Sequence, residues 1–142
     1  MKKLNKWGVA TAIVGLLIVL TPVVFPVCEG LLELVNGKQV PMRCFWTARA
    51  EMIIGGLVVI SGLLVAFAKS EDARRRLNNQ VIFLGLATIL TPLYIIPTCM
   101  HPDMACNIAT KPALIILGIV VTGLGLYGSF LPRPEVLPSG AK

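Results

Sequence analysis

Four long apolar stretches alternate with short polar segments along the chain. They are Trp7–Pro26, Thr47–Ala68, Asn79–Pro97 and Pro112–Leu131. Each is about 20 residues long, the length at which an α-helix crosses a hydrocarbon core of roughly 30 Å. Because lipid offers no hydrogen-bond partners, a spanning segment must satisfy its backbone groups internally. We therefore predict an all-α membrane protein, a bundle of four transmembrane helices.

The composition leaves little room for a soluble part. Of 142 residues, 56% are hydrophobic and only 14% are charged, against about 25% charged residues in an average soluble domain. The first apolar stretch follows a basic start, but no A-x-A cleavage site comes after it, so we expect an uncleaved helix. The prediction is one integral-membrane domain over residues 1–142, in which 132–142 form a flexible cytoplasmic tail.

Basic residues gather on one side of the predicted membrane. Nine of the 13 lie before the first stretch, between the second and third, or after the fourth: Lys2, Lys3, Lys6, Lys69, Arg74, Arg75, Arg76, Arg133 and Lys142. The opposite side has four: Lys38, Arg43, Arg49 and Lys111. The positive-inside rule predicts both termini in the cytoplasm and a location in the cell (inner) membrane. Anionic lipid explains the net charge of +6, so we expect no nucleic-acid partner.

The two halves of the chain resemble each other. Leu20-Thr21-Pro22 recurs as Leu90-Thr91-Pro92, and Met42-x-Cys44 recurs as Met104-x-Cys106. This pattern indicates a duplicated helical hairpin, with one repeat over residues 7–68 and the other over 79–131. Two-span repeats are parallel and are related by an axis along the membrane normal, so both loops between the hairpin helices are expected on the same, extracytoplasmic face.

All four cysteines fall on that outer face. They are Cys28, Cys44, Cys99 and Cys106. An even number of cysteines in an oxidising compartment predicts disulfides. A unit that once existed singly had to satisfy its own cysteines, which favours Cys28–Cys44 and Cys99–Cys106 over the crossed pairings.

A soft-metal site is one alternative use of this face. Thioethers and imidazole suit copper, and the candidate ligands are Met42, Met100, His101 and Met104. Their spacing matches no zinc site, which would need cysteines two to four residues apart. Disulfides would also remove the thiolates. Packing roles are therefore favoured, and we expect no cofactor.

A thiol-redox protein is the other alternative. Four helices with two external cysteine pairs are similar to the layout of DsbB-like, quinone-coupled disulfide oxidases. The chain has no C-x-x-C motif, which is the spacing that poises a dithiol for exchange. Structural disulfides are therefore favoured, with quinone as the cofactor of this alternative.

Charged side chains cluster where the second apolar stretch begins. Trp46, Arg49 and Glu51 follow Cys44 closely. We expect Thr47 to cap the helix and Glu51 to lie in its first turn, where the helix dipole favours an anion. A carboxyl inside an apolar stretch is nevertheless costly and is a functional candidate. Arg49, two residues away, cannot face it on a helix, so its partner would be Lys111 or a group on another subunit.

This region also resembles a known family. An LTP-containing first helix, a cysteine and the pattern M-x-C-x-W-T-x-x-A-E are similar to an uncharacterised family of small four-span bacterial and archaeal membrane proteins. The residues that match are Cys28, Met42, Cys44, Trp46, Thr47, Ala50 and Glu51. Members are often encoded beside MacB-like (FtsX-type) ABC transporter permeases. The family pattern has a histidine where this chain has Phe45, which weakens a metal role.

The sequence thus favours a non-enzymatic accessory or scaffold subunit that contacts the bilayer and another integral-membrane subunit. The resemblance implies a MacB-like ABC transporter as that partner. Trp46, Arg49, Glu51 and Lys111 are the predicted partner or ligand contacts, beside the disulfide-braced outer loops. The alternative is a thiol-redox or copper-binding membrane protein that uses the same face.

Overall fold

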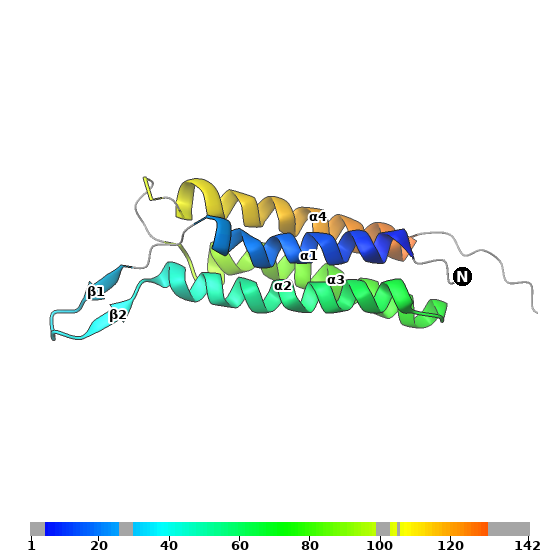
Figure 1. The fold of residues 1–142 in the computed structure, drawn as a ribbon, viewed down its shortest axis with the longest axis horizontal. Coiled ribbons are helices and arrows are strands. Elements are labelled where there is room, and N and C mark those ends of the chain that lie inside the picture. Colours follow the sequence, from blue (N-terminus) through cyan, green and yellow to red (C-terminus); the bar gives the residue numbers. More distant parts are fainter. Residues whose placement is uncertain (1–4, 26–29, 99–102, 105, 131–142) are drawn as a thin grey trace, which may run out of the picture.

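The computed structural model is an elongated bundle of four helices with a β-hairpin projecting from one end (Figure 1). It describes residues 5–25, 30–98, 103–104 and 106–130. The helices are α1 (Lys6–Val24), α2 (Arg43–Phe67), α3 (Glu71–Leu90) and α4 (Lys111–Phe130). Two π-turns, η1 (Thr91–Ile95) and η2 (Cys106–Thr110), follow α3 and precede α4. The antiparallel strands are β1 (Leu31–Glu33) and β2 (Gln39–Pro41). We name the bundle end that carries β1 and β2 the hairpin end.

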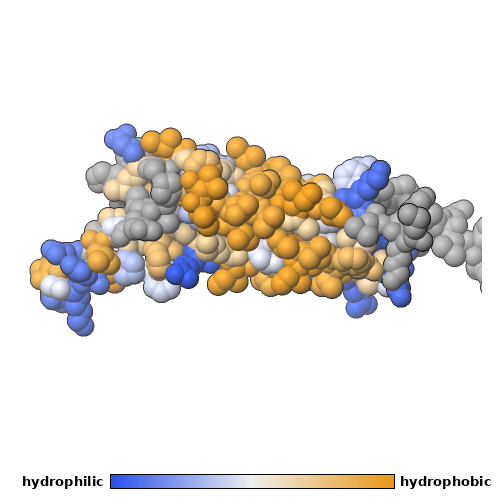
Figure 2. All heavy atoms as spheres, in the orientation of Figure 1, coloured by the Kyte–Doolittle hydropathy of each residue, from blue (hydrophilic) through white to orange (hydrophobic). Residues whose placement is uncertain are grey.

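All four helices are long and apolar enough to cross a membrane. With their π-turns they span 19 to 25 residues, and the mean hydropathy of their most apolar windows is 1.2 to 2.2. Figure 2 shows one face of the bundle, which is apolar across its middle and carries polar residues toward its ends. The predicted class, a multi-pass helical membrane protein, is confirmed. The β-hairpin is an element that the prediction lacked.

Two helices begin well before the apolar stretches that predicted them. α2 begins at Arg43 rather than Thr47, and α3 begins at Glu71 rather than Asn79. The reason is that hydropathy marks only the part of a helix that lies in hydrocarbon, whereas the helix can continue into the polar interface. An ion pair of 3.6 Å between Arg74 Nη1 and Glu71 Oε1 supports the first turn of α3.

The expected cap of α2 is wrong. The N-cap residue is Met42, so Thr47 lies inside the helix and Glu51 is about two turns from its start. Thr47 donates instead to the carbonyls of Arg43 (3.2 Å) and Ile96 (2.9 Å). Glu51 is therefore beyond the first turn in which the helix dipole would favour an anion.

Glycines let paired helices approach backbone to backbone. A Cβ at Gly8 would lie 2.4 Å from the nitrogen of Ala66, and one at Gly62 would lie 2.5 Å from that of Ala12. In α3, a Cβ at Gly85 would lie 2.4 Å from the hydroxyl of Thr122 in α4. Such contacts supply van der Waals attraction where lipid removes the hydrophobic drive for association. α1 therefore packs closely on α2, and α3 on α4.

The interior is narrow and the exterior is bulky. The core consists of a few medium-sized side chains: Ile18, Val58, Val81, Leu114 and Val121. Large aromatic side chains, such as Phe83 and Phe130, are exposed on the outside. This arrangement fits a lipid surround, in which exposed apolar area is not penalised.

Gly62→Ala tests the close approach of α1 and α2. The added methyl would collide with the backbone of α1, so we expect a lower thermal midpoint in detergent. Gly56→Ala is the matched control, because nothing lies within 4 Å of its Cβ position. The control should match the wild type or exceed it slightly, since alanine favours helix over glycine by about 1 kcal/mol in water. Equal midpoints for the two variants would contradict this packing.

Candidate functional site

The hairpin end of the bundle gathers the predicted site residues that the structure describes. Cys44, Trp46, Arg49 and Glu51 lie in the first part of α2, and Lys111 is the first residue of α4. The other predicted residues lie outside the described part of the chain: Cys28, Cys99, Met100 and His101. The roles predicted for those four stay predictions.

Two cysteines from opposite halves of the chain meet inside this end. The sulfur of Cys44 in α2 lies 3.1 Å from the sulfur of Cys106 in η2. Both side chains are buried, with 1% of their surface exposed. The predicted disulfides assign these residues to different pairs with Cys28 and Cys99, so that pairing stays a prediction. The contact joins positions 62 residues apart, and no spacing rule within one loop could have indicated it.

Glu51 is buried completely and faces the bundle interior. Its exposed fraction is 0%, and neither carboxyl oxygen has a hydrogen-bond partner in the described part of the chain. It shares the buried stripe of α2 with Cys44, Thr47, Ala48 and Gly55. An isolated carboxylate in such surroundings is very costly. At this position the Glu51 carboxyl group therefore needs a bound proton, a cation or a polar ligand.

The basic residues predicted near Glu51 do not satisfy it. Arg49 is exposed, and its guanidinium carbon lies 5.1 Å from the centre of the Phe45 ring. Lys111 is half-buried. Within residues 5–25, 30–98, 103–104 and 106–130, the one ion pair is Arg74–Glu71 in the first turn of α3. The structure thus leaves the predicted pairing of Glu51 with Lys111 without a supporting contact.

Three buried threonines, Thr47, Thr91 and Thr110, lie toward the hairpin end, and two of them already donate their proton. Thr91 lies beside Glu51 and donates to the carbonyl of Ala87 at 2.8 Å. Thr47 links α2 to the carbonyl of Ile96 after η1. The buried hydroxyl of Thr110 in η2 has no hydrogen-bond partner among the described residues. These oxygens can accept a hydrogen bond or contact a cation, but Thr47 and Thr91 have no further proton to donate.

Trp46 and Arg49 face away from the bundle. Trp46 is 55% exposed and touches Phe45 edge-on, with ring centres 5.9 Å apart. An exposed tryptophan at a helix start fits either the membrane interface or a protein contact. The two residues therefore remain candidates for contact with a partner, whereas Glu51 is accessible only from inside the bundle.

The β-hairpin is a functional candidate that our sequence reasoning missed. Leu31 pairs with Pro41 and Glu33 with Gln39. Gly37 turns the chain with a positive φ of 71°, and its N–H donates to the carbonyl of Leu34 at 2.8 Å. Asn-Gly between two short extended runs is a strong hairpin signal and could have predicted the turn. The tip carries the exposed side chains of Leu34 and Val35.

Two methionines of the predicted metal set, Met42 and Met104, lie in the described part of the chain, and both make contacts within the protein. Met42 lies against Gly30, where its Cε is 2.7 Å from the place of a Cβ. The carbonyl of Met104 accepts hydrogen bonds from the N–H groups of Asn107 and Ile108. Within the described ranges, no group of three or more His, Cys, Asp or Glu residues could hold a metal ion.

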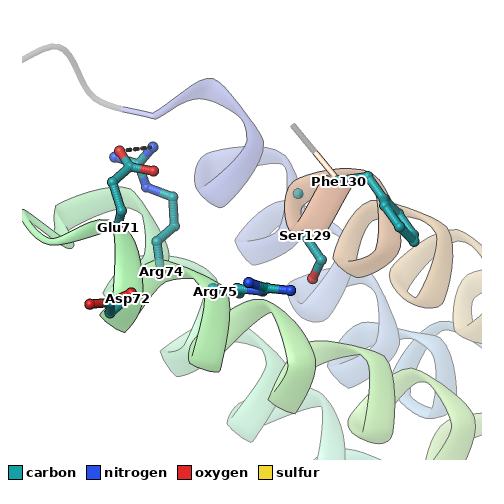
Figure 3. Close-up of a pocket in the computed structure, with 7 residues that line it drawn as sticks. Glu71, Asp72, Arg74, Arg75, Ser129 and Phe130 are labelled. Carbon is teal, nitrogen blue, oxygen red and sulfur yellow. Dashed lines mark ion pairs between the residues drawn. The ribbon is translucent and has the colours of Figure 1, made fainter. Parts of the chain in front are cut away.

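Two hollows also lie on the described part of the chain. An apolar groove of about 390 Å³ lies between α1 and α4, lined by Leu17, Leu20, Thr21, Val24, Phe25, Ala113, Ile116 and Leu117. A hollow of about 210 Å³ lies between the first turn of α3 and the last of α4 (Figure 3). The paired Arg74 and Glu71 are among the residues that line it, and Arg75 points toward Ser129. Because both charge signs line the second hollow, it has no clear preference for an ionic ligand.

Glu51→Met tests the cost of the buried carboxyl. Methionine has a similar shape and fills irregular apolar space. The free energy of unfolding of the variant in detergent should therefore be about 1–3 kcal/mol higher than that of the wild type. Glu33→Met, on the exposed hairpin, is the control and should change little. A destabilised Glu51→Met variant would show that the carboxyl holds a partner in the folded membrane protein.

Comparison with known proteins adds a family to this geometry. Searches of curated proteins and of solved structures give no match. The family model described as "Domain of unknown function (DUF4418)" matches residues 11–131, which include all four helices in whole or large part. The chain is therefore a member of the DUF4418 family.

Proposed function

We propose that this protein is a non-enzymatic accessory subunit that packs in the membrane against a larger complex and recognises it through the hairpin end. A MacB-like ABC transporter is the candidate complex that the family resemblance suggests. The observation that carries the proposal is the projection of the β1–β2 hairpin beyond the helices (Figure 1). We place this end outside the cell membrane, because Lys69, Arg74, Arg75 and Arg76 lie at the opposite end.

The hairpin has the properties of a recognition element. Its exposed apolar side chains are Leu31, Leu34, Val35 and Val40, and the β1–β2 hairpin itself projects beyond the helices (Figure 1). Its strands have no third neighbour in the described sheet. A two-stranded hairpin with free edges is marginally stable alone and offers backbone groups to which a partner strand can add. A partner that covers the apolar tip and one edge would satisfy both features.

The bundle supports this role as a rigid base. We infer that it consists of two parallel copies of a helical hairpin. Thr21 and Thr91 are both buried and both donate to the carbonyl four residues earlier, at 2.7 and 2.8 Å. The prolines that follow them, Pro22 and Pro92, are buried as well. Glycine contacts pair α1 with α2 and α3 with α4 in the same manner. A parallel duplication would bring both outer loops to one face, as a recognition surface requires.

Trp46 and Arg49 extend the proposed surface from the hairpin to the start of α2. Tryptophan and arginine are enriched among residues that dominate binding energy. Lys111 at the start of α4 adds a half-buried cation. The four positions of the predicted contact set then divide into three that can reach a partner and one, Glu51, that can act only inside the bundle.

The double variant Leu34→Ser/Val35→Ser tests the proposed surface. Removing the apolar tip should weaken binding of the partner complex at least ten-fold, which corresponds to about 1.4 kcal/mol. Lys38→Gln, in the same hairpin, is the matched control because it leaves the apolar tip in place. Co-purification with a MacB-like permease expressed from the same organism measures the effect. Retention of the permease at wild-type levels by the double variant would refute the hairpin as the recognition element.

A second candidate function is thiol-redox or soft-metal chemistry at the same end. The 3.1 Å contact between the sulfurs of Cys44 and Cys106 favours it, because sulfur groups from α2 and η2 lie within reaction distance. A copper site would need thiolates or thioethers to remain available, and a redox role would need bonds that exchange with an external dithiol or a quinone.

Counting thiols separates the two candidate functions. For the accessory role we expect detergent-purified protein to show two disulfides before reduction, four thiols after it, and no bound copper or haem. Reactive thiols together with stoichiometric copper would favour the second candidate. Thiol labelling by mass and elemental analysis of the same sample give both readings.

A further inference from the structure

The contact between Cys44 and Cys106 connects the two halves of the chain at the bundle interior. Cys44 is in the first turn of α2, and Cys106 opens η2. Their sulfur atoms are 3.1 Å apart. Reacting atoms held about 3–3.5 Å apart are in near-attack range. The two sulfurs therefore already have the separation that thiol–disulfide exchange needs.

The surroundings of the pair favour reaction between these two sulfurs over reaction with solvent. Both side chains are almost fully buried, so an external thiol reaches them less easily than they reach each other. Cys106 belongs to a π-turn, a conformation that is common at functional sites because it departs from regular helix. In the first half of the chain, the corresponding Cys44 lies in regular α-helix. The two positions are thus close but differ in backbone conformation.

We propose that Cys44 and Cys106 form a thiol–disulfide exchange pair that moves a disulfide bond between the two halves of the bundle. The step begins when one thiolate of a dithiol reductant attacks the partner sulfur of a bond held by Cys44, so that Cys44 leaves as a thiolate. The second thiol of the reductant then closes the reductant's own disulfide and releases the partner's thiol. The Cys44 thiolate attacks the sulfur of Cys106 in its own disulfide. The Cys44–Cys106 bond forms, the former partner of Cys106 leaves as a thiolate, and a proton from water completes its thiol.

The exchange consumes no oxidant, because one disulfide is present before and after the attack. The predicted partners of the two residues, Cys28 and Cys99, lie outside the described part of the chain, and the exchange pair consists of Cys44 and Cys106 alone. The product bond would join α2 directly to η2 and α4. When a bond within one helical hairpin opens, the exchange would thus produce a cross-link between the two helical hairpins. This device is independent of the proposed accessory role and could serve either candidate function.

Disulfide mapping of the Cys28→Ser variant tests the proposal. The full-length protein is purified in detergent, quenched with acid, alkylated and digested, and its disulfide peptides are identified by mass. We expect a Cys44–Cys106 peptide and alkylated Cys99. A Cys99–Cys106 peptide with alkylated Cys44 as the only product would overturn the proposal. Cys44→Ser is the control, because it lacks the attacking sulfur and should keep the Cys99–Cys106 peptide. A Cys28–Cys106 peptide in that control would also overturn the proposal, because exchange would not need Cys44.

A time course on the wild type covers the case in which a variant fails to fold. Less than one equivalent of dithiothreitol is added to the native protein, and samples are quenched at intervals. The Cys44–Cys106 peptide should increase as the peptides of the starting bonds decrease, with alkylation of the two other cysteines. Loss of the starting bonds without this peptide would overturn the exchange pair. Binding of the partner complex is not measured here, so failure of the accessory proposal leaves this outcome unaffected.

Discussion

The close approach of helix backbones is the constraint on which the rest of this structure depends. In lipid the hydrophobic effect does not drive helices together, so association requires dense van der Waals contact. Gly8 against Ala66 and Gly62 against Ala12 allow it in the first half, and Gly85 against Thr122 allows it in the second. Because the pairs are tight, the interior has room for few large side chains, and bulky residues point outward. Glu51 is an exception, because it is among the largest fully buried side chains of the bundle.

The small interior also contains several polar threonines whose hydroxyl groups bond to the helix backbone. Thr11, Thr21, Thr88 and Thr91 each donate to a carbonyl four residues earlier, so the helices satisfy the hydroxyls themselves. Thr47 differs, because it also reaches the carbonyl of Ile96 across the gap between α2 and the end of η1. Glu51 has no comparable partner in the described residues. Its position is therefore better explained by a function than by stability, since unsatisfied buried groups reduce stability.

The sequence predicted the four spans well because apolar length is a direct physical requirement of a bilayer. The ends of α2 and α3 were less predictable, since a helix continues past the hydrocarbon where hydropathy falls. The β-hairpin was missed although Asn36-Gly37 indicates a turn, because a loop bounded by cysteines was read only as a staple. The contact between Cys44 and Cys106 was predictable only in part, because the repeat matches the two residues and puts both at one face but does not bring their sulfurs together. It depends on the rotation of α2 and on the π-turn before α4, and neither leaves a local pattern in the sequence.

The two halves of the bundle differ at one position that concerns function. Glu51 is seven residues after Cys44, and Ala113 is seven residues after Cys106. Glu51 lies beside Thr91 between α2 and α3, whereas Ala113 and Thr21 line an apolar groove between α1 and α4. If the halves are copies, corresponding interfaces have become a closed polar contact on one side and an open apolar groove on the other. A scaffold that needed only stability would have kept alanine on both sides, since alanine leaves no buried carboxyl to satisfy. The buried carboxyl of Glu51 therefore argues that the bundle interior at the hairpin end does more than hold the helices together.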